Sequence, residues 1–314
     1  MKPVLTVILP VLNGMPYLRA ALASLEAQTL RDFEVVLWDN GSTDGTVEEA
    51  GQWIPSRLPG RVVTGEPLPL QQCLARMVQE AETPLVARMD ADDISLPHRF
   101  EEQVRFLKEH PEVSLVGCQI ECMDREGSLM PKESWANYPV THQDLVTTLL
   151  FNCPFCHPSI LFRAEAVRQI GNYATPAPVE DLDLYLRLTQ TAIVANLPTV
   201  GLHYRIHPAS ICSIASKDNR HAELSLATVT RHVKDLFGLD PATYLQLRNK
   251  AHPVVIVPLL RSAFYRARGQ WSLFFRIMGT PTFLYIGRCL TGKGDLVSRL
   301  AFRVLALFAT PSSP

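Results

Sequence analysis

The first ninety residues alternate between two patterns of hydrophobic and polar positions. Apolar residues recur at three- and four-residue spacing in three segments, which predicts amphipathic helices over residues 17–25, from Ser42 or Asp44 to Trp53, and over 74–81. Nearly continuous apolar runs, typical of buried strands, occupy residues 4–11, 33–38, 61–64 and 85–89. Strands and helices in this order predict a parallel sheet covered on both faces, with ligands bound beyond the carboxyl ends of the strands.

The second part of the chain follows a mixed pattern. Pro97 precedes a helical pattern through Leu107, and Asp181–Leu188 opens another helix. Strand patterns cover residues 113–123, 160–162 and 194–206. The first leads into a turn at 124–127, and Pro198 is expected to break the last. The fold class predicted is α/β, with a second half that is not cleanly parallel.

No segment reads as a membrane span or a signal peptide. Lys2 followed by apolar residues 4–12 imitates a signal peptide, but Pro10, Asn13 and Gly14 interrupt the run, which favours a buried first strand. The longest charge-free run, residues 145–162, contains Asn and Pro residues that do not suit a lipid-exposed helix. A cytoplasmic protein is the expectation.

The near-zero net charge of −1 hides two regions of opposite sign. Residues 1–240 hold 30 acidic and 20 basic residues, whereas residues 241–314 hold 10 basic residues and one acid, Asp295. Aromatic side chains are interleaved with the basic residues of this tail, and a helix is predicted over 295–309. A helical cap on the body and a contact with an anionic membrane surface both fit this pattern, whereas no nucleic-acid-binding module is recognisable.

Seven cysteines are an odd number in a chain too large to depend on disulfides. Cys153 to His157 matches haem-attachment and redox-dithiol patterns, but reduced cysteines packed near a loop are the better interpretation, and their role stays open. A zinc site would need a second pair, which Cys118 and Cys122 could supply at a spacing that is not diagnostic.

Three carboxylates follow the fourth predicted strand within four residues, at Asp90, Asp92 and Asp93. Such a cluster repels itself unless a cation stabilises it, and hard oxygen ligands favour Mg²⁺ or Mn²⁺. Asp39 ends the second predicted strand, so it belongs at the same edge of the sheet. A solvated acidic loop and, for Asp39, a turn-forming role are the alternatives.

Two further sets of residues carry candidate chemistry. Glu180 and Asp181 open a predicted helix, where they serve either its N-terminus or as a general base facing the metal site. Three histidines, each more often structural than ligating, complete the candidates: His157, His203 and His207. The sequence lacks the glycine-rich motif of dinucleotide-binding folds and the P-loop signature.

Taken in order, these motifs resemble the family 2 glycosyltransferases of the GT-A fold. The resemblance covers about residues 4–212 and rests on the following segments: Val7–Asn13, Phe33–Asp44, Ala87–Pro97, Cys156–Ser159, Val179–Leu184 and Tyr204–Pro208. It implies a GT-A-like catalytic domain over 1–215, with a donor-binding half (1–93) and an acceptor-side half (94–215). Residues 216–314 would form a mainly helical basic C-terminal region.

The resemblance also implies roles for individual residues. The nucleotide sugar would contact Pro10, Leu12, Asn13, Asp39, Arg76 and Asp90. Asp92 and His207 would bind a divalent cation, and Asp181, with Glu180 beside it, would be the catalytic base. The sequence departs from the family's pattern at residues 74–77, which lack the usual Asn and Gly, and at Asn40, where many members have a second Asp.

The function so implied is metal-dependent, inverting transfer of a hexosyl or N-acetylhexosaminyl group from a nucleotide-diphosphate sugar, a UDP-sugar above all. The acceptor would be a saccharide or a lipid-linked hydroxyl in cell-surface polysaccharide or glycolipid synthesis. The basic tail, which lies outside the resemblance, adds the expectation that the protein is peripheral on the inner face of the plasma membrane. Two other classes stay open: a phosphotransferase or phosphatase with Asp90 as nucleophile, and a non-catalytic sugar- or membrane-binding protein with a glycosyltransferase-like body.

Overall fold

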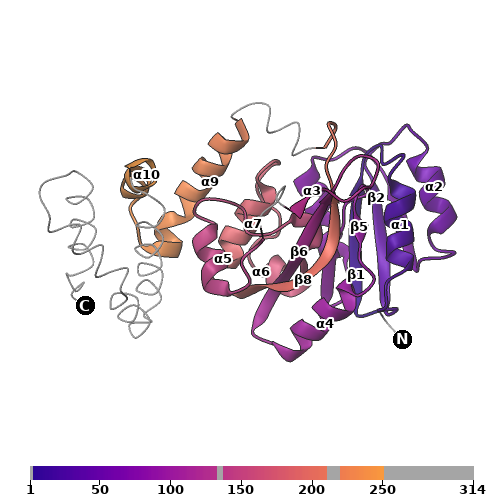
Figure 1. The fold of residues 1–314 in the computed structure, drawn as a ribbon, viewed down its shortest axis with the longest axis horizontal. Helices are drawn as coiled ribbons and strands as arrows, with labels where there is room; N and C mark the ends of the chain where they lie inside the picture. Colours follow the sequence, from indigo (N-terminus) through magenta and orange to yellow (C-terminus); the bar gives the residue numbers. More distant parts are fainter. Residues whose placement is uncertain (1–2, 133–136, 211–219, 251–314) are drawn as a thin grey trace, which may run out of the picture. The chain divides into compact units, whose positions relative to one another are not determined.

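The structure, a computed structural model, describes residues 3–132, 137–210 and 220–250 (Figure 1). The chain divides into two compact units, residues 1–225 and residues 226–314. The sheet lies in the first unit.

Four parallel strands form the first half of an eight-stranded sheet of order β3-β2-β1-β4-β7-β6-β8-β5. They are β1 (Leu5–Val11), β2 (Phe33–Asp39), β3 (Gly60–Thr64) and β4 (Leu85–Arg88). This half matches the predicted strands to within a residue or two. Because β2 and β4 both run parallel to β1 on either side of it, their carboxyl ends lie at one edge of the sheet.

The second half of the sheet is mixed, as predicted. Strand β7 (Leu161–Arg163) is antiparallel to both β4 and β6 (Val113–Met123), β8 (Ile193–Arg205) is parallel to β6, and the two-residue β5 (Ile94–Ser95) is antiparallel to β8. Pro198 does not break β8: it lies in an irregular stretch in which the pairing moves from Gly117–Asn196 to Gln119–Val200. The missing N–H of Pro198 is therefore accommodated within one continuous strand.

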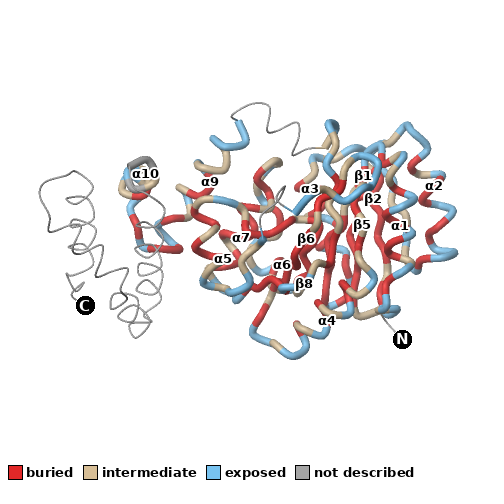
Figure 2. The backbone as a smooth tube through the Cα atoms, viewed as in Figure 1, coloured by how far each residue is buried: buried red, intermediate tan, exposed pale blue. Residues whose placement is uncertain are grey.

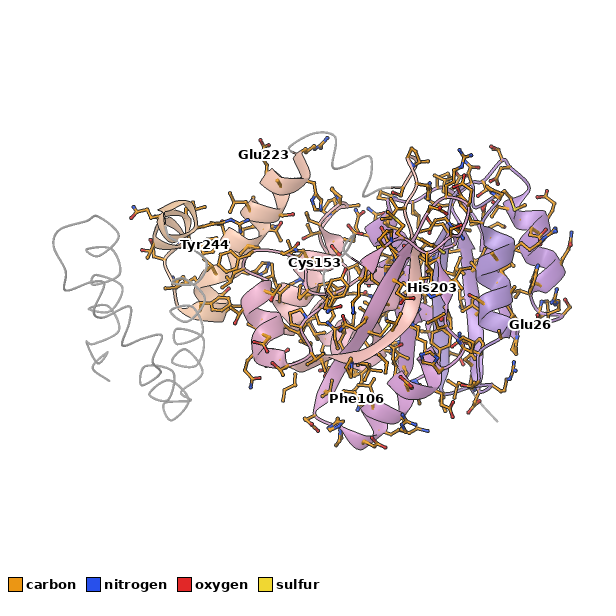
Figure 3. The ribbon with its side chains drawn as sticks, in the orientation of Figure 1. Glu26, Phe106, Cys153, His203, Glu223 and Tyr244 are labelled. Carbon is orange, nitrogen blue, oxygen red and sulfur yellow. The ribbon has the colours of Figure 1, made fainter. Side chains whose placement is uncertain are left out.

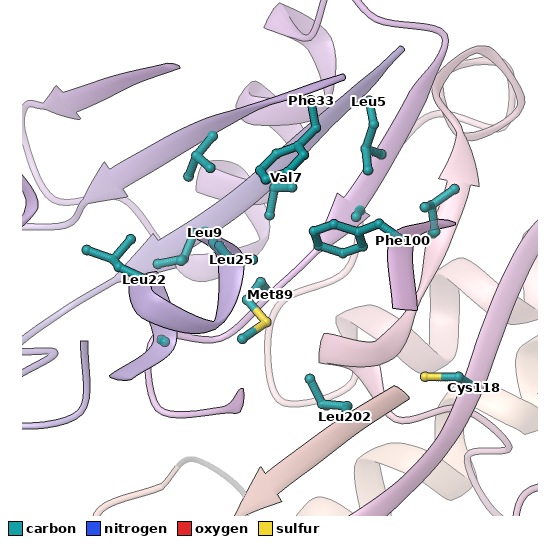
Figure 4. Close-up of a cluster of buried hydrophobic side chains, with 14 of the residues drawn as sticks. Leu5, Val7, Leu9, Leu22, Leu25, Phe33, Met89, Phe100, Cys118 and Leu202 are labelled. Atoms are coloured by element: carbon teal, nitrogen blue, oxygen red, sulfur yellow. The ribbon is translucent and has the colours of Figure 1, made fainter. Parts of the chain in front are cut away.

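Helices cover both faces of this sheet. On one face α1 (Leu18–Glu26), α2 (Thr46–Trp53) and α4 (Arg99–Glu109) contribute apolar side chains to the buried cluster that contains Leu5, Val7 and Leu9 of β1 (Figure 4). On the other, α3 (Leu70–Glu80) contacts β1 and β2 and packs beside α6 (Ala164–Gln169). Alternate residues of a strand point to opposite faces, so a strand covered on both sides is apolar throughout, and Figure 2 shows β1 and β2 buried along their length.

The remaining elements of the first unit follow β6. They are α5 (His142–Thr148), the 3₁₀ helix η2 (His157–Ser159) and α7 (Glu180–Leu188). Several helix starts differ from prediction, and the largest difference is at α3, which begins at Leu70 where the pattern predicted residue 74. The α2 helix begins after Gly45, which has φ of +90°, while the Asp44 carboxylate still accepts the Thr46 N–H at 3.2 Å; α4 begins at Arg99, two residues after Pro97.

The predicted basic C-terminal region falls mostly outside the described residues. Its described part consists of α9 (Arg220–Phe237), which crosses the boundary between the two units, and α10 (Pro241–Lys250). The helix predicted over 295–309 and the aromatic residues of the tail beyond residue 250 lie outside the described residues. Among the described helices, none combines the length and the apolar character that crossing a membrane requires.

Candidate active site

The three carboxylates that follow β4 converge. Asp90, Asp92 and Asp93 each offer an oxygen atom within 4.8 Å of the others, and they form the one such group of potential metal ligands found among the described residues. Backbone pairing explains the convergence, because the chain turns after β4 and enters β5, which is held against Leu202 and His203 of β8. The turn is thereby fixed at the carboxyl edge of the sheet.

Asp90 is paired with a buried arginine. The Arg88 guanidinium, 6% exposed, donates from NH1 to the Asp90 Oδ2 at 2.6 Å. Burial raises the pKa of Asp90 to about 6 in spite of the opposing charge of Arg88. Arg88 is the last residue of an otherwise apolar strand, so β4 places a positive charge next to the first carboxylate of the acidic cluster.

Asp93 is fully buried. Its Oδ1 accepts the Arg205 backbone N–H at 2.8 Å, while its Oδ2 has no protein partner. Burial, together with the neighbouring Asp90 and Asp92, raises the pKa of Asp93 well above its usual value. An unpaired buried carboxylate oxygen is costly unless a proton or a cation satisfies it.

Asp92 meets the end of β8. Its Oδ2 lies 2.8 Å from the Nε2 of His207, 115 residues later in the chain. The Arg205 side chain supports this contact by donating from Nε to the Asp92 carbonyl oxygen at 2.7 Å, and its guanidinium lies 4.6 Å from the centre of the Tyr17 ring. Tyr17 also packs against the His207 imidazole, with ring centroids 5.1 Å apart.

The donor set fits a hard divalent cation. Three carboxylates supply oxygen atoms, one of them orphaned and buried, and His207 adds a nitrogen at the rim. Asp92 and His207, the predicted metal pair, are in direct contact, and Asp93 joins them as a further candidate. Arg88 leaves Asp90 one oxygen for other contacts, because its ion pair uses only Oδ2.

A second pair of carboxylates belongs to α7. Glu180 and Asp181 occupy the first turn of this helix, where the Asp181 Oδ1 accepts the Leu182 N–H at 2.7 Å. The Glu180 Oε2 is buried without a partner. Burial, followed by repulsion from Asp181, raises the pKa of Glu180 to about 7, and burial likewise raises the pKa of Asp181.

Arg88 connects the two groups of carboxylates electrostatically. It pairs with Asp90, and its charge also opposes the rise in the pKa of Glu180 and of Asp181. His157 lies next to Glu180: its Nδ1 is 3.9 Å from the Glu180 Oε1, and its Nε2 is 2.8 Å from the Tyr173 hydroxyl. Burial and the Arg88 charge lower the pKa of His157 well below its usual value, so it is neutral and structural.

The predicted nucleotide-contacting loop is pinned by hydrogen bonds. Asn13, with φ of +54°, accepts the Thr43 N–H on its side-chain oxygen and donates its own N–H to the Ser42 hydroxyl at 2.7 Å. Asp39 is buried, and its Oδ2 accepts the N–H groups of Gly41 and Ser42, each at 3.1 Å, which is the turn-forming role weighed for it. Its position at the end of β2 is nevertheless the expected edge of the sheet.

Three other predicted donor contacts lie at the same edge. Pro10 pairs in register with Trp38 in the sheet, and Leu12, directly after β1, is 57% exposed. Arg76 of α3 lies over the Trp38 ring at 5.1 Å while its Nε donates to Glu80 at 2.9 Å. Arg76 is thus on the Trp38 side of the site, with its charge shared with Glu80.

The remaining candidates do not join the acidic cluster. The backbone of His203 pairs with Ile94 of β5, but its side chain pairs with Glu121 across β8 and β6, at 3.2 Å. The five cysteines among the described residues form no disulfide with one another, and Cys118 and Cys122 form no metal group with Cys153 and Cys156 there. The structure adds three residues to which the sequence assigned no role: Arg88, Tyr173 and Arg205. Of these, Arg88 alone could have been noticed in the sequence, because it is a lone arginine in an apolar strand.

Comparisons with known proteins agree with this architecture. The chain belongs to glycosyl transferase family 2, whose model matches residues 6–171, more than half of its length. It is 34% identical over 190 residues to the amylovoran biosynthesis glycosyltransferase AmsE of Erwinia amylovora, covering 60% of this chain and 70% of that protein. It is 29% identical over 213 residues to the O-antigen biosynthesis glycosyltransferase WbnJ of Escherichia coli, covering 66% and 81%.

Solved structures show the same fold. The S. aureus TarS 1–349 complex with UDP-GlcNAc matches with a TM-score of 0.61 at 18% identity, covering 85% of this chain and 73% of that one. The mannosyltransferase PcManGT from Pyrobaculum calidifontis, in complex with GDP-Man and Mn²⁺, matches with a TM-score of 0.55 at 18% identity, covering 99% and 82%. The predicted GT-A-like mixed sheet with helices is confirmed for the described residues.

Proposed function

We propose that this glycosyltransferase transfers a hexosyl or N-acetylhexosaminyl group, with inversion, from a nucleotide-diphosphate sugar to an acceptor hydroxyl, with Mn²⁺ or Mg²⁺ as cofactor. The observation that carries the proposal is that the Arg88 charge acts on two groups of carboxylates: the cluster of Asp90, Asp92 and Asp93, through its ion pair with Asp90, and the pair of Glu180 and Asp181. Structures with this fold hold UDP-GlcNAc, or GDP-Man and Mn²⁺, which supports a donor of this class.

The chemistry requires both groups. A sugar hydroxyl is a weak nucleophile, so the Asp181 carboxylate would accept its proton as the oxygen attacks the anomeric carbon. The leaving diphosphate gains charge, which a divalent cation held by Asp92 and His207, with Asp93 beside them, would neutralise. Inversion places the base and the leaving group on opposite sides of the anomeric carbon.

The nucleotide would lie along the edge formed by β1 and β2. Asp39, Pro10, Leu12 and Asn13 would contact its base and ribose, with Arg76 and Asp90 toward the diphosphate sugar. The hydrogen-bonded, pre-formed loop at Asn13 supports this placement. The Asp39 oxygens each have a second lone pair, so its turn bonds leave it able to accept another donor.

An aspartyl-phosphate mechanism has less support. Asp90 keeps one carboxylate oxygen that Arg88 does not hold, but the family match is to glycosyltransferases and not to phosphatases. The relatives' names also favour surface polysaccharide synthesis as the setting, with a saccharide or lipid-linked acceptor.

Thermal denaturation with nucleotides tests the proposed function directly. UDP or GDP should raise the melting temperature of the full chain only when Mn²⁺ or Mg²⁺ is present. Asp92→Ala should lose this stabilisation, whereas Asp181→Asn should keep it and release no nucleotide from any donor sugar in a donor screen. Turnover by Asp181→Asn at the wild-type rate would refute the base assignment, and no metal-dependent stabilisation by any nucleotide would refute the donor class.

The proposal extends to an anionic membrane surface as partner of the basic tail, residues 241–314. The test is co-sedimentation of the full chain with vesicles containing phosphatidylglycerol or phosphatidylcholine alone. Binding should require the anionic lipid and weaken at high salt, because the attraction is screened. Equal binding to both kinds of vesicle, or by a 1–240 chain, would reject it.

A further inference from the structure

One side chain that the proposed mechanism does not use contacts the proposed base. The segment between α5 and η2 carries Cys153, whose Sγ lies 3.6 Å from the Oδ2 of Asp181. The same Sγ lies 3.4 Å from the carbonyl oxygen of Phe155. Cys153 (labelled in Figure 3) is partly exposed, whereas the other four cysteines of the described residues are buried.

The contact completes the hydrogen bonding of the Asp181 carboxylate. Its Oδ1 accepts the Leu182 N–H from its own helix, and its Oδ2 faces the thiol from a segment 28 residues earlier in the chain. A carboxylate held on both oxygens has a fixed orientation about its last torsion angle. Each oxygen retains a further lone pair, so Oδ2 can still accept a proton.

We propose that Cys153 is a positioning residue for catalysis, whose thiol orients the Asp181 carboxylate toward the acceptor hydroxyl and releases it when the carboxylate becomes protonated. The inference rests on the proposed function, in which Asp181 is the base. A thiol has one proton and two acceptors here, the Asp181 Oδ2 and the Phe155 carbonyl oxygen. Before transfer the S–H donates to Oδ2, and afterwards it turns to the carbonyl oxygen.

The proton balance of the step is simple. The acceptor hydroxyl gives its proton to the Asp181 Oδ2 while its oxygen forms the bond to the anomeric carbon. The bond from that carbon to the diphosphate oxygen breaks, and its electron pair leaves with the nucleotide. The thiol proton of Cys153 is never transferred, so the thiol acts only through the orientation and basicity of Asp181.

The weakness of a thiol donor suits this role. A hydroxyl would bind the carboxylate more strongly and make it a poorer base, whereas an alanine would leave Oδ2 without its donor. Other groups also set the basicity of Asp181. Burial raises its pKa, and lowering contributions come from the Leu182 N–H, Arg88, the Cys153 thiol and His221, in that order. The remaining titratable groups facing it are Glu180, Tyr173 and Tyr185.

The test measures single-turnover nucleotide release by the full chain between about pH 5 and pH 9, for Cys153→Ala and Cys153→Ser. In Cys153→Ala the acid limb of the profile should move to higher pH by about half a unit, with a several-fold loss of rate near pH 6. In Cys153→Ser the limb should move to lower pH. Metal-dependent stabilisation by the nucleotide should stay at the wild-type value in both.

A matched control separates this role from packing. Cys73→Ala removes a buried thiol on α3 that contacts Met77 and not Asp181, so its pH profile should superimpose on that of the wild type. Superposition of the Cys153→Ala and Cys153→Ser profiles on the wild type would overturn the inference, and the serine variant decides if the alanine variant does not fold. Turnover by Asp181→Asn would instead refute the proposed function, so the two failures are distinguishable.

Discussion

Arg88 donates to Asp90 across 2.6 Å, between the guanidinium NH1 and the carboxylate Oδ2, and so attaches the acidic turn to the end of β4. The arginine side chain is 6% exposed and the aspartate side chain 27% exposed. A charge in that position is costly to bury, and the ion pair is what offsets the cost. The pair also orients the first carboxylate of the candidate metal site.

Removing the Arg88 charge should therefore damage stability and activity together. Arg88→Met leaves Asp90 without its partner and should lower the free energy of unfolding by about 2–4 kcal/mol, measured by urea denaturation. Transfer activity should fall more than tenfold, because Asp90, Glu180 and Asp181 all lose the positive charge between them.

Arg61→Met is the matched control for Arg88→Met. Arg61 pairs with Glu80 at 3.6 Å, and both side chains are well exposed, so its loss should cost less than about 0.5 kcal/mol. Equal effects of the two substitutions would show that burial of the Arg88–Asp90 pair has no energetic consequence.

A glycine at the start of β3 should be intolerant of any side chain. Gly60 has φ of +143°, and a Cβ there would run into the backbone carbonyl oxygen of Val35 on β2. Gly60→Ala should destabilise the protein by about 3 kcal/mol or more. Gly51→Ala, in the middle of α2 with open space around it, should instead stabilise by about 0.5–1 kcal/mol. Thermal melts of both variants would check this, and a neutral Gly60→Ala would contradict the steric argument.

The elements of the parallel half could be predicted from sequence because their burial dictates the pattern. A strand covered on both faces is largely apolar along its length, and β1 and β2 are so except at Thr6, Glu34 and Asp39. Their shared direction places Asp39 and the Asp90–Asp93 turn at one edge, as predicted. The acidic cluster could therefore be predicted from the sequence, because parallel strands place the residues that follow them at the same edge of the sheet.

The contacts that complete the site could not be predicted in this way. The Asp92–His207 contact depends on β5, whose two residues carry no recognisable periodicity, pairing with a strand more than a hundred positions later. The role of Arg88 depends on what faces it from α7, which no local pattern encodes. The sequence predicts a break in the strand at Pro198 because a proline lacks the N–H that a strand needs. The irregular pairing that accommodates Pro198 within β8 has no distinct signal in the sequence.

His207 should tune the cation requirement of the enzyme. Because its Nε2 contacts Asp92, His207→Ala should raise the Mn²⁺ concentration needed for half-maximal nucleotide binding by about tenfold. His203→Ala is the matched control: its backbone pairs with Ile94 beside the turn, but its side chain pairs with Glu121, so the substitution should leave the metal titration unchanged. Identical metal titrations for the wild type and His207→Ala would remove His207 from the proposed metal pair.

Glu180 should make the stability of the fold depend on pH. Its pKa is about 7 in the folded protein and 4.5 in an ordinary environment, so between these values the folded state holds a proton that the unfolded state has lost. The contribution of this group to stability therefore falls as the pH rises from about 4.5 to 7 and stays low above that. The Glu180→Gln variant has no carboxyl proton to lose. Its free energy of unfolding relative to the wild type should therefore increase by about 1–3 kcal/mol between pH 5 and pH 8.

Urea denaturation at pH 5, 6, 7 and 8 measures this difference. The control is Glu48→Gln, which replaces an exposed carboxyl group on α2 and should change the free energy of unfolding by a nearly constant amount across this range. A constant offset for Glu180→Gln as well would mean that Glu180 is ionised in the folded protein throughout this range, and the buried, partnerless Oε2 would need a cation rather than a proton to satisfy it.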